Sequence, residues 1–376
     1  MLLKKTLIAL TVSTLLLSGC GSSSNDETTV PADDAGFSFD ATEVITNLTN
    51  DVIVEGYEVL NDKANAFFLA TKTLVNTPTD DNLLAAQNAW KAAREPWEQG
   101  ESHIFGPVDG LSIDPHLDSW PLNTTDLQGV LDGSTAFSAD SVKSSNDDVQ
   151  GFHTMEFLLF GDGVADNEKL IADMTLRERE YLSATAEVFQ EYTQDLYDAW
   201  VTGDDAYQDK LLTVDNNIYA SKLAVVEELI NGMIGIVDEV GNGKISDPFG
   251  NSTATADTSL VESQYSWNSL TDFTDNIQGV QNVYRGEFEG GADKQGIIDF
   301  VKAADATLSS RVDTEIANAI AAIKAIAGTE GASLPFRQAI SDTDARVRIQ
   351  AAIDALATLQ TSLENDVLTL LNKWGV

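Results

Sequence analysis

Residues 40–80 read DATEVITNLTNDVIVEGYEVLNDKANAFFLATKTLVNTPTD, and this stretch indicates the fold class. Its apolar side chains recur at the spacing of one face of an α-helix, namely Ile45, Leu48, Val52, Leu60, Phe67 and Leu74. Pro78 ends the pattern, because proline cannot continue a helix. A second helix follows, for which Asp80 is the predicted N-cap, with Leu83, Ala86, Trp90 and Ala93 facing inward.

The rest of the chain repeats this pattern and predicts an all-α fold. Further helices are expected at about 147–160, 168–202, 211–240, 266–288, 294–326 and 342–374. Two stretches rich in turn residues, 105–140 and 241–257, interrupt the helices. The second stretch suits a connection, and we place the domain boundary between 203 and 257. We expect an N-terminal helical domain at 40–210 and a C-terminal one at 211–376, with an ancient duplication as one origin for two halves of similar length.

Composition excludes several classes of protein. The 376 residues carry a formal net charge of −38, which would repel the phosphates of a nucleic acid. One cysteine excludes an internal disulfide framework and any cysteine-rich zinc or iron–sulfur site. Hydrophobic residues make up 43% of the chain, enough for a sizeable core.

The N-terminus has the features of a lipoprotein leader. Lys4 and Lys5 precede an apolar run at 6–17 that is too short to span a bilayer, and the sequence LSGC follows at 17–20. We expect a signal peptide at 1–19, lipidation of Cys20 and a flexible tether at 20–39. Removing the leader leaves 20 basic and 60 acidic residues, a charge of −40. Gly21 after the cysteine suits the outer membrane, with the protein facing the periplasm or the surface; an ordinary secretory signal with an incidental cysteine is the alternative.

A histidine and a glutamate form the sharpest candidate site. GFHTMEFLLFG at 151–161 places His153 and Glu156 one helical turn apart, where they could offer an imidazole and a carboxylate to one cation. The apolar neighbours imply burial, so both groups need partners. The alternative is that the two side chains only bond each other.

A second cluster lies on the second predicted helix. Trp90, Arg94, Trp97 and Glu101 form one stripe at helical spacing. One interpretation is an inert Arg94–Glu98 ion pair packed under tryptophan; the other makes Glu98 or Glu101 the further carboxylate that a metal site at His153 requires.

A third cluster follows at 264–286. Asn268, Asp272 and Asn276 align on one helix face, which is either a capping region with surface or the lining of a polar cleft. The sequence contains no H-E-x-x-H or H-x-x-E-H motif, no Walker loop and no G-x-S-x-G.

Four sequence blocks in this order resemble the imelysin family. They run from Trp90 to Pro107, from Leu117 to Pro121 (LDSWP), over GFHTMEFLLFG and over QYSWNSLTDFTDNIQGVQNVYRG at 264–286. The resemblance covers residues 40–374 and implies two all-α bundle-like domains packed side by side, with the G-x-H-x-x-E signature near their interface. The family is classed with metallopeptidases and includes insulin-cleaving metalloproteinase-like and iron-regulated proteins.

Three functions remain open. The first is a lipid-anchored envelope protein that binds a metal ion, iron first and zinc as the alternative, or a metal chelate, together with other iron-uptake components and without nucleic acid. The second is a metallopeptidase that uses His153 and Glu156, and the third is a metal-free module for a peptide or small ligand. One imidazole and several carboxylates suit an oxygen-preferring cation better than a zinc peptidase site. The predicted metal ligands are His153, Glu156, Glu98, Glu101 and Asp118. The predicted pocket lining is Arg94, Trp97, Trp120, Ser266, Trp267, Asp272 and Asn276.

Overall fold

A computed structural model describes residues 36–288, 294–329 and 333–375, and these residues are all-α, as predicted. Within them no β-strand forms; an isolated bridge joins Phe37 to Trp374. The α-helices are α1 (Thr42–Asn47), α2 (Glu55–Asn76), α3 (Asp80–Gly100), α4 (Pro107–Gly110), α5 (Asp114–Asp118), α6 (Thr124–Asp132), α7 (Ala139–Lys143), α8 (Gly151–Phe160), α9 (Leu176–Val201), α10 (Tyr207–Leu212), α11 (Lys222–Asp238), α12 (Asp247–Phe249), α13 (Ser269–Arg285), α14 (Ile297–Ala304), α15 (Ala306–Ala325), α16 (Phe336–Ala339) and α17 (Thr343–Ser362). Three π-helical segments, Leu48–Val54, Glu239–Ser246 and Leu363–Val367, continue α1, α11 and α17.

The first two predicted helices form as the sequence indicates. Residues 42–76 are helical throughout, and the inward residues predicted for α3 are buried. The N-cap of α3 differs by one position. The cap is Thr79, whose Oγ1 accepts a hydrogen bond from Asn82 N at 3.2 Å, and Asp80 is the first residue of the helix.

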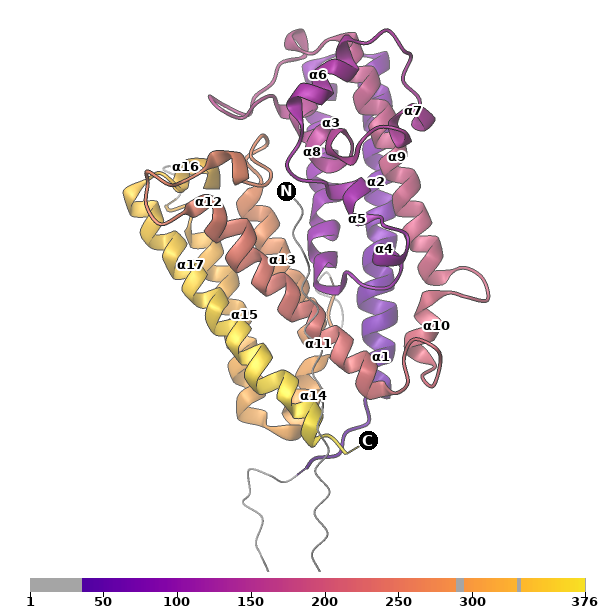
Figure 1. Cartoon of the computed structure of the whole chain (residues 1–376), viewed down its shortest axis with the longest axis vertical. Coiled ribbons are helices and arrows are strands. Elements are labelled where there is room, and N and C mark those ends of the chain that lie inside the picture. The colour runs from indigo at the N-terminus through magenta and orange to yellow at the C-terminus, as the bar shows by residue number, and fades with distance from the viewer. Residues whose placement is uncertain (1–35, 289–293, 330–332, 376) are drawn as a thin grey trace, which may run out of the picture. The chain divides into compact units, whose positions relative to one another are not determined.

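The helices form two groups that meet along α3 and α13. Helices α2, α3, α8 and α9 pack against one another, and α11, α13, α15 and α17 form the second group (Figure 1). Gly279 permits the close contact between α3 and α13, because a Cβ at this position would lie 2.0 Å from the backbone oxygen of Gln99. Polar side chains on these two helices therefore come within bonding distance.

Helix α8 carries the H-x-x-E motif through the core. All its residues except Phe157 are buried, so His153 and Glu156 lie among mostly apolar side chains. The Trp90 indole donates a hydrogen bond to the Phe152 backbone oxygen at 3.1 Å, and the Phe152 ring packs on Phe189 with centroids 4.5 Å apart. These contacts fix α8 between α3 and α9.

The two stretches predicted to interrupt the helices are partly helical. Residues 105–140 hold the short helices α4, α5 and α6 and the start of α7. The stretch at 241–257 continues α11 as the π-helix Glu239–Ser246, followed by α12, and the side chain of Lys244 is buried. The domain division at residue 210 and the duplication stay predictions.

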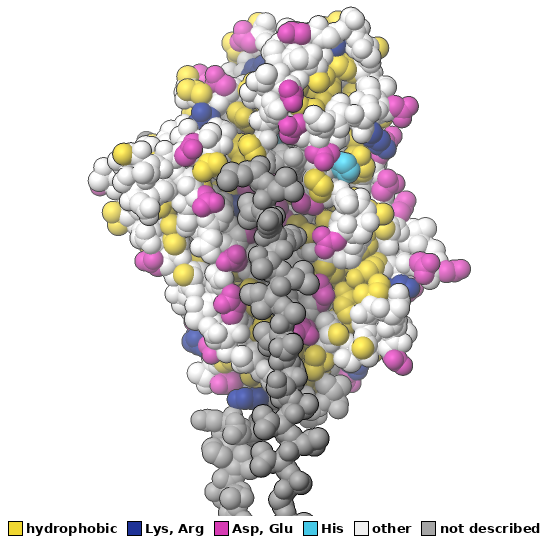
Figure 2. Space-filling model, in the orientation of Figure 1, with side chains coloured by type: hydrophobic (Ala, Val, Ile, Leu, Met, Phe, Trp, Pro, Cys, Tyr) yellow, Lys and Arg dark blue, Asp and Glu magenta, His cyan; other side chains and the backbone are white. Residues whose placement is uncertain are grey.

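The signal peptide, Cys20 and most of the tether lie outside the described residues. Among the described helices, none combines the length and apolar character needed to cross a bilayer. Acidic side chains outnumber basic ones over the face shown in Figure 2, in keeping with the net charge of −38.

Candidate functional site

His153 projects from the first turn of α8 and is 1% exposed. Its Nδ1 lies 3.1 Å from Glu156 Oε2 in a hydrogen bond within the same turn. The other carboxylate oxygen of Glu156 accepts three hydrogen bonds, from Tyr265 N at 3.0 Å and from Ser266 N and Oγ at 2.7 Å each. Glu156 therefore orients the imidazole and ties α8 to the segment before α13.

Gly151 sets the start of α8 and cannot carry a side chain. Its φ is +73°, and a Cβ there would lie 2.4 Å from the backbone oxygen of Leu117. The first residue of the G-x-H-x-x-E motif thus lets α8 approach the end of α5, which carries Asp118.

The second ring nitrogen of His153 faces two carboxylates from distant parts of the chain. Nε2 lies 3.1 Å from Asp118 Oδ1 and 3.8 Å from Glu262 Oε1. Neither contact has hydrogen-bond geometry, and Nε2 has no hydrogen-bond partner among the residues described. Ligand atoms of these three residues lie within 4.8 Å of one another, the only such group of metal-ligating side chains in the described parts of the chain. This arrangement could hold a metal ion.

Arg94 lies beneath this group and is fully buried. It contacts carboxylates from α3, α5, the segment before α13 and α13 itself, namely Glu98, Asp118 at 2.5 Å, Glu262 at 2.5 Å and Asp272 at 3.4 Å. One guanidinium thereby holds the Asp118 and Glu262 carboxylates close together, a geometry that suits its several planar donors. The Arg94–Glu98 ion pair predicted from their spacing is present within this larger network.

Lys244 forms a neighbouring network with the acids of α3. Its Nζ lies 2.7 Å from Glu101 Oε2 and 3.3 Å from both Glu98 Oε2 and Glu262 Oε2. Asn276 Nδ2 donates to Glu98 Oε2 at 2.6 Å and to Glu101 Oε2 at 2.7 Å. The Glu98 and Glu101 carboxylates thus bind an ammonium and an amide and do not belong to the group around His153 Nε2.

Burial and the neighbouring charges shift the pKa values of the acids and of His153 in this cluster. Burial raises the pKa of Glu98 and Glu101, that of Glu101 to about 8, although Lys244 lies against both. Burial acts in the same direction on Asp118, but Arg94 and His153 hold the pKa of Asp118 well below its usual range. For His153, burial lowers the pKa, but the Asp118 and Glu156 carboxylates raise it to about 9. A metal ion at this position would therefore displace the proton that the Asp118 and Glu156 carboxylates hold on His153.

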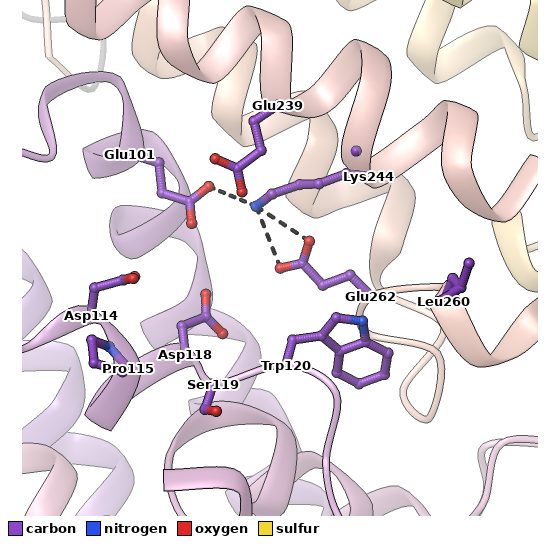
Figure 3. A pocket seen from close by; sticks show the side chains of 11 residues that line it. Glu101, Asp114, Pro115, Asp118, Ser119, Trp120, Glu239, Lys244, Leu260 and Glu262 are labelled. Atoms are coloured by element: carbon purple, nitrogen blue, oxygen red, sulfur yellow. Dashed lines mark hydrogen bonds and ion pairs between the residues drawn. The ribbon is translucent and has the colours of Figure 1, made fainter. Parts of the chain in front are cut away.

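A cavity of about 440 Å³ adjoins the group. Asp118 and Glu262 form part of its wall, and Trp120 lies beside them, with its ring centroid 4.5 Å from that of His153 (Figure 3). The rest of the lining includes Glu101, Asp114, Glu239 and Lys244. The site is therefore reached through a predominantly acidic cavity.

The structure brings together most of the residues that the sequence singled out. Of the predicted pocket lining, Trp120 borders the cavity, whereas Arg94, Trp97, Ser266, Asp272 and Asn276 lie in the hydrogen-bonded networks behind it. Trp267 points elsewhere, because its Nε1 donates to the Gly163 backbone oxygen at 2.8 Å. Glu156 bonds Nδ1 of His153, whereas Asp118 and Glu262 lie near Nε2. His153 and Glu156 therefore do not face one common space as ligands of the same cation would.

Two central residues were missed by the sequence analysis, Glu262 and Lys244. Glu262 stands two residues before the block at 264–286, but it belongs to no periodic pattern. Lys244 lies in a Gly- and Asn-containing stretch of the kind that forms connections, and nothing in the sequence indicated its burial.

A family model, that of Imelysin (peptidase M75), matches residues 53–363. Iron-regulated protein A of Synechococcus elongatus is 29% identical over 333 residues, which is 88% of this chain and 86% of that protein.

Two solved structures share the fold. A protein of Parabacteroides distasonis, described as an iron-regulated protein A precursor, superposes with a TM-score of 0.76 at 29% identity, covering 93% of this chain and 98% of the other. An imelysin-like protein of Psychrobacter arcticum gives a TM-score of 0.69 at 14% identity over 90% and 98% of the two chains, which supports the fold alone.

Proposed function

The chain belongs to the imelysin family, and on that premise we propose that it binds a metal ion through Asp118, His153 and Glu262 in bacterial iron metabolism. Iron is the expected metal, because relatives over most of the chain are named for regulation by iron. One imidazole with two carboxylates is a donor set that iron, manganese and zinc accept.

The observation that carries the proposal is the position of His153 Nε2. This nitrogen is buried and makes no hydrogen bond with the described residues, and it faces Asp118 as an ion pair. A metal ion could replace the proton between these donors. Donors that share one ion lie about 3–3.5 Å apart at metal–ligand distances near 2.1 Å. The 3.1 Å separation of Nε2 from Asp118 Oδ1 falls within this range, and the 3.8 Å separation from Glu262 Oε1 lies slightly beyond it. Glu156 on Nδ1 is the carboxylate that commonly orients a ligating histidine.

Isothermal titration calorimetry of the wild type with Fe²⁺ under anaerobic conditions, Mn²⁺ and Zn²⁺ tests the proposal. We expect one high-affinity equivalent, and a loss of at least about 100-fold in His153→Gln or Glu262→Gln, because each variant removes one of three ligands. His116→Gln is the matched control: His116 lies on the same helix as Asp118, but its side chain pairs with Asp147 and stacks on Tyr192. Equal affinity in the wild type and His153→Gln would reject these ligands.

We further propose that Cys20 is lipidated and anchors the protein in the cell envelope. The motif LSGC at 17–20 supports this proposal. Mass spectrometry of the purified protein should find a diacylglyceryl-modified Cys20 at the mature N-terminus, and Cys20→Ala should release the protein into the soluble fraction. An unmodified N-terminus elsewhere in the chain would contradict it.

The metallopeptidase and the metal-free binding module remain the two alternatives, and each predicts a different experimental result. A peptidase that used Glu156 as a general base would need a free carboxylate oxygen, but both oxygens accept hydrogen bonds. Chelator-sensitive cleavage of an unfolded protein that Glu156→Gln abolishes would favour the peptidase. A structure of the protein with an organic molecule in the cavity and no metal would favour the binding module.

A further inference from the structure

The acidic cavity indicates which chemical form of the metal reaches the site. Its wall includes five carboxylates, and Lys244 is the cationic side chain among its lining residues. The carboxylates are Glu101, Asp114, Asp118, Glu239 and Glu262. A second cavity, of about 360 Å³, shares Glu101, Asp114 and Glu239 with the first and adds Glu228. Acidic side chains therefore line both cavities.

An independent observation points to a ligand at the inner wall. Asp118 and Glu262, which line the cavity, are the two carboxylates that His153 Nε2 faces at 3.1 and 3.8 Å. This nitrogen is buried and has no hydrogen-bond partner among the described residues. A cation that entered the cavity would meet carboxylates first and the imidazole behind them.

The cavity is large enough for a cation that keeps its water. Six water molecules at the volume of liquid water, about 30 Å³ each, need about 180 Å³, less than half of the 440 Å³ available. An anionic chelate, such as a metal bound by citrate or a catecholate, would instead place its own carboxylates or phenolates against those of the wall, and like charges at close range repel. Burial raises the pKa of Asp114 to about 6, so this carboxyl is mostly ionised at neutral pH. Burial also raises the pKa of Glu239, and repulsion from Asp118 contributes at both acids.

We infer that the cavity admits the metal as a hydrated cation and excludes anionic chelates, with Asp114 and Glu239 attracting the cation toward His153. This inference rests on the proposed metal-binding function. Asp114 and Glu239 line the cavity and attract the cation as it enters. The metal ligands are Asp118, His153 and Glu262. Clefts lined by one sign of charge raise the association rate of an oppositely charged ligand by about 10- to 1,000-fold.

Stopped-flow mixing of the full-length protein with Mn²⁺, followed by tryptophan fluorescence, tests the entry route. Trp97 donates to Asp118 at 2.6 Å and Trp120 packs on His153, so both report on the site. In Asp114→Asn/Glu239→Gln we expect the association rate to fall at least about 10-fold at low ionic strength, with a smaller difference at high salt and an unchanged dissociation rate. The control is Glu180→Gln/Glu187→Gln, which removes the same charge from a different cavity wall.

A second arm compares ligands. The wild type should bind Fe²⁺ and Mn²⁺ and show no saturable binding of a preformed ferric–citrate complex. Ferric citrate bound as tightly as the free cations, or an association rate in Asp114→Asn/Glu239→Gln equal to that of the wild type, would overturn the inference. If either result occurred and His153→Gln still abolished metal binding, the proposed metal site would remain supported and only the inferred entry route would be rejected. Failure of the wild type to bind any cation would overturn both.

Discussion

Glu156 Oε2 and His153 Nδ1 lie 3.1 Å apart within one turn of α8, and this contact determines what the other side of the imidazole can do. Because Glu156 accepts at Nδ1, Nε2 is the nitrogen left to face Asp118 and Glu262. In the proposed metal site, the H-x-x-E spacing therefore supplies one ligand and its orienting partner, and the remaining ligands come from α5 and from the segment before α13.

Glu156→Gln should weaken metal binding about 10- to 100-fold, the usual effect of losing a partner that orients a ligating histidine. A glutamine has one acceptor oxygen, so it cannot accept from both His153 and the Tyr265–Ser266 segment. Calorimetry with Mn²⁺ measures the loss, and Glu187→Gln on α9 is the control. Unchanged affinity would show that the imidazole is held without Glu156.

Lys244→Met should destabilise the metal-free protein and increase its response to metal. The substitution leaves Glu101 without a cationic partner, while Glu98 and Glu262 keep Arg94. An unpaired buried charge typically costs about 3–5 kcal/mol. A bound cation offsets part of that charge, so the rise in Tm on saturation with Mn²⁺ should be larger in the variant than in the wild type. Differential scanning calorimetry with and without metal measures both effects.

The control for this variant is Lys169→Met, which removes another mostly buried ion pair, that with Glu178. Its metal-induced rise in Tm should equal that of the wild type. An equal or smaller rise in Lys244→Met would contradict the view that the ammonium and the metal neutralise the same carboxylates.

The helices of this chain could be predicted from sequence because their signals are local. The apolar periodicity of residues 42–76 and the spacing of Trp90, Arg94 and Trp97 depend on neighbours within a few turns. The contact of His153 with Glu156 could be predicted for the same reason.

Glu262 and Lys244 could not be predicted, because their roles arise from long-range packing. Glu262 reaches His153 only when α13 packs on α3. That contact requires a residue without a side chain at position 279, which is a glycine. Lys244 is buried because α11 continues as a π-helix toward the acids of α3. Neither residue has a spacing or a local motif that marks it in a single sequence.

Gly151→Ala should destabilise the protein and weaken metal binding together. An alanine must adopt a φ of +73° and place its Cβ 2.4 Å from the Leu117 backbone oxygen, so α8 has to move away from α5. We expect a loss of about 2–4 kcal/mol in the free energy of unfolding, from backbone strain and steric overlap. Gly129→Ala in α6 is the matched control, because no heavy atom lies within 4 Å of its added Cβ; it should be neutral or slightly stabilising.

Urea denaturation measures the stability of both glycine variants, and calorimetry with Mn²⁺ measures their affinity. The affinity of Gly151→Ala should fall because the displacement separates His153 from Asp118, whereas that of Gly129→Ala should not change. A destabilised Gly151→Ala with wild-type affinity would show that the position of α8 against α5 does not determine the metal site.

Asp275→Asn should stabilise the protein at neutral and alkaline pH. Burial, followed by repulsion from Asp272 and Glu95, raises the pKa of Asp275 to about 8 from an unfolded value near 3.8. Between these values the folded state binds the proton that the unfolded state has released, so wild-type stability falls as the pH rises from about 4 to 8. An asparagine has no charge to lose, so the difference between the variant and the wild type should be near zero at pH 4 and grow to about 1–3 kcal/mol by pH 8. Urea denaturation of both proteins across this pH range measures the difference, and a gain that was the same at pH 4 and pH 8 would show that titration of this carboxyl is not its source.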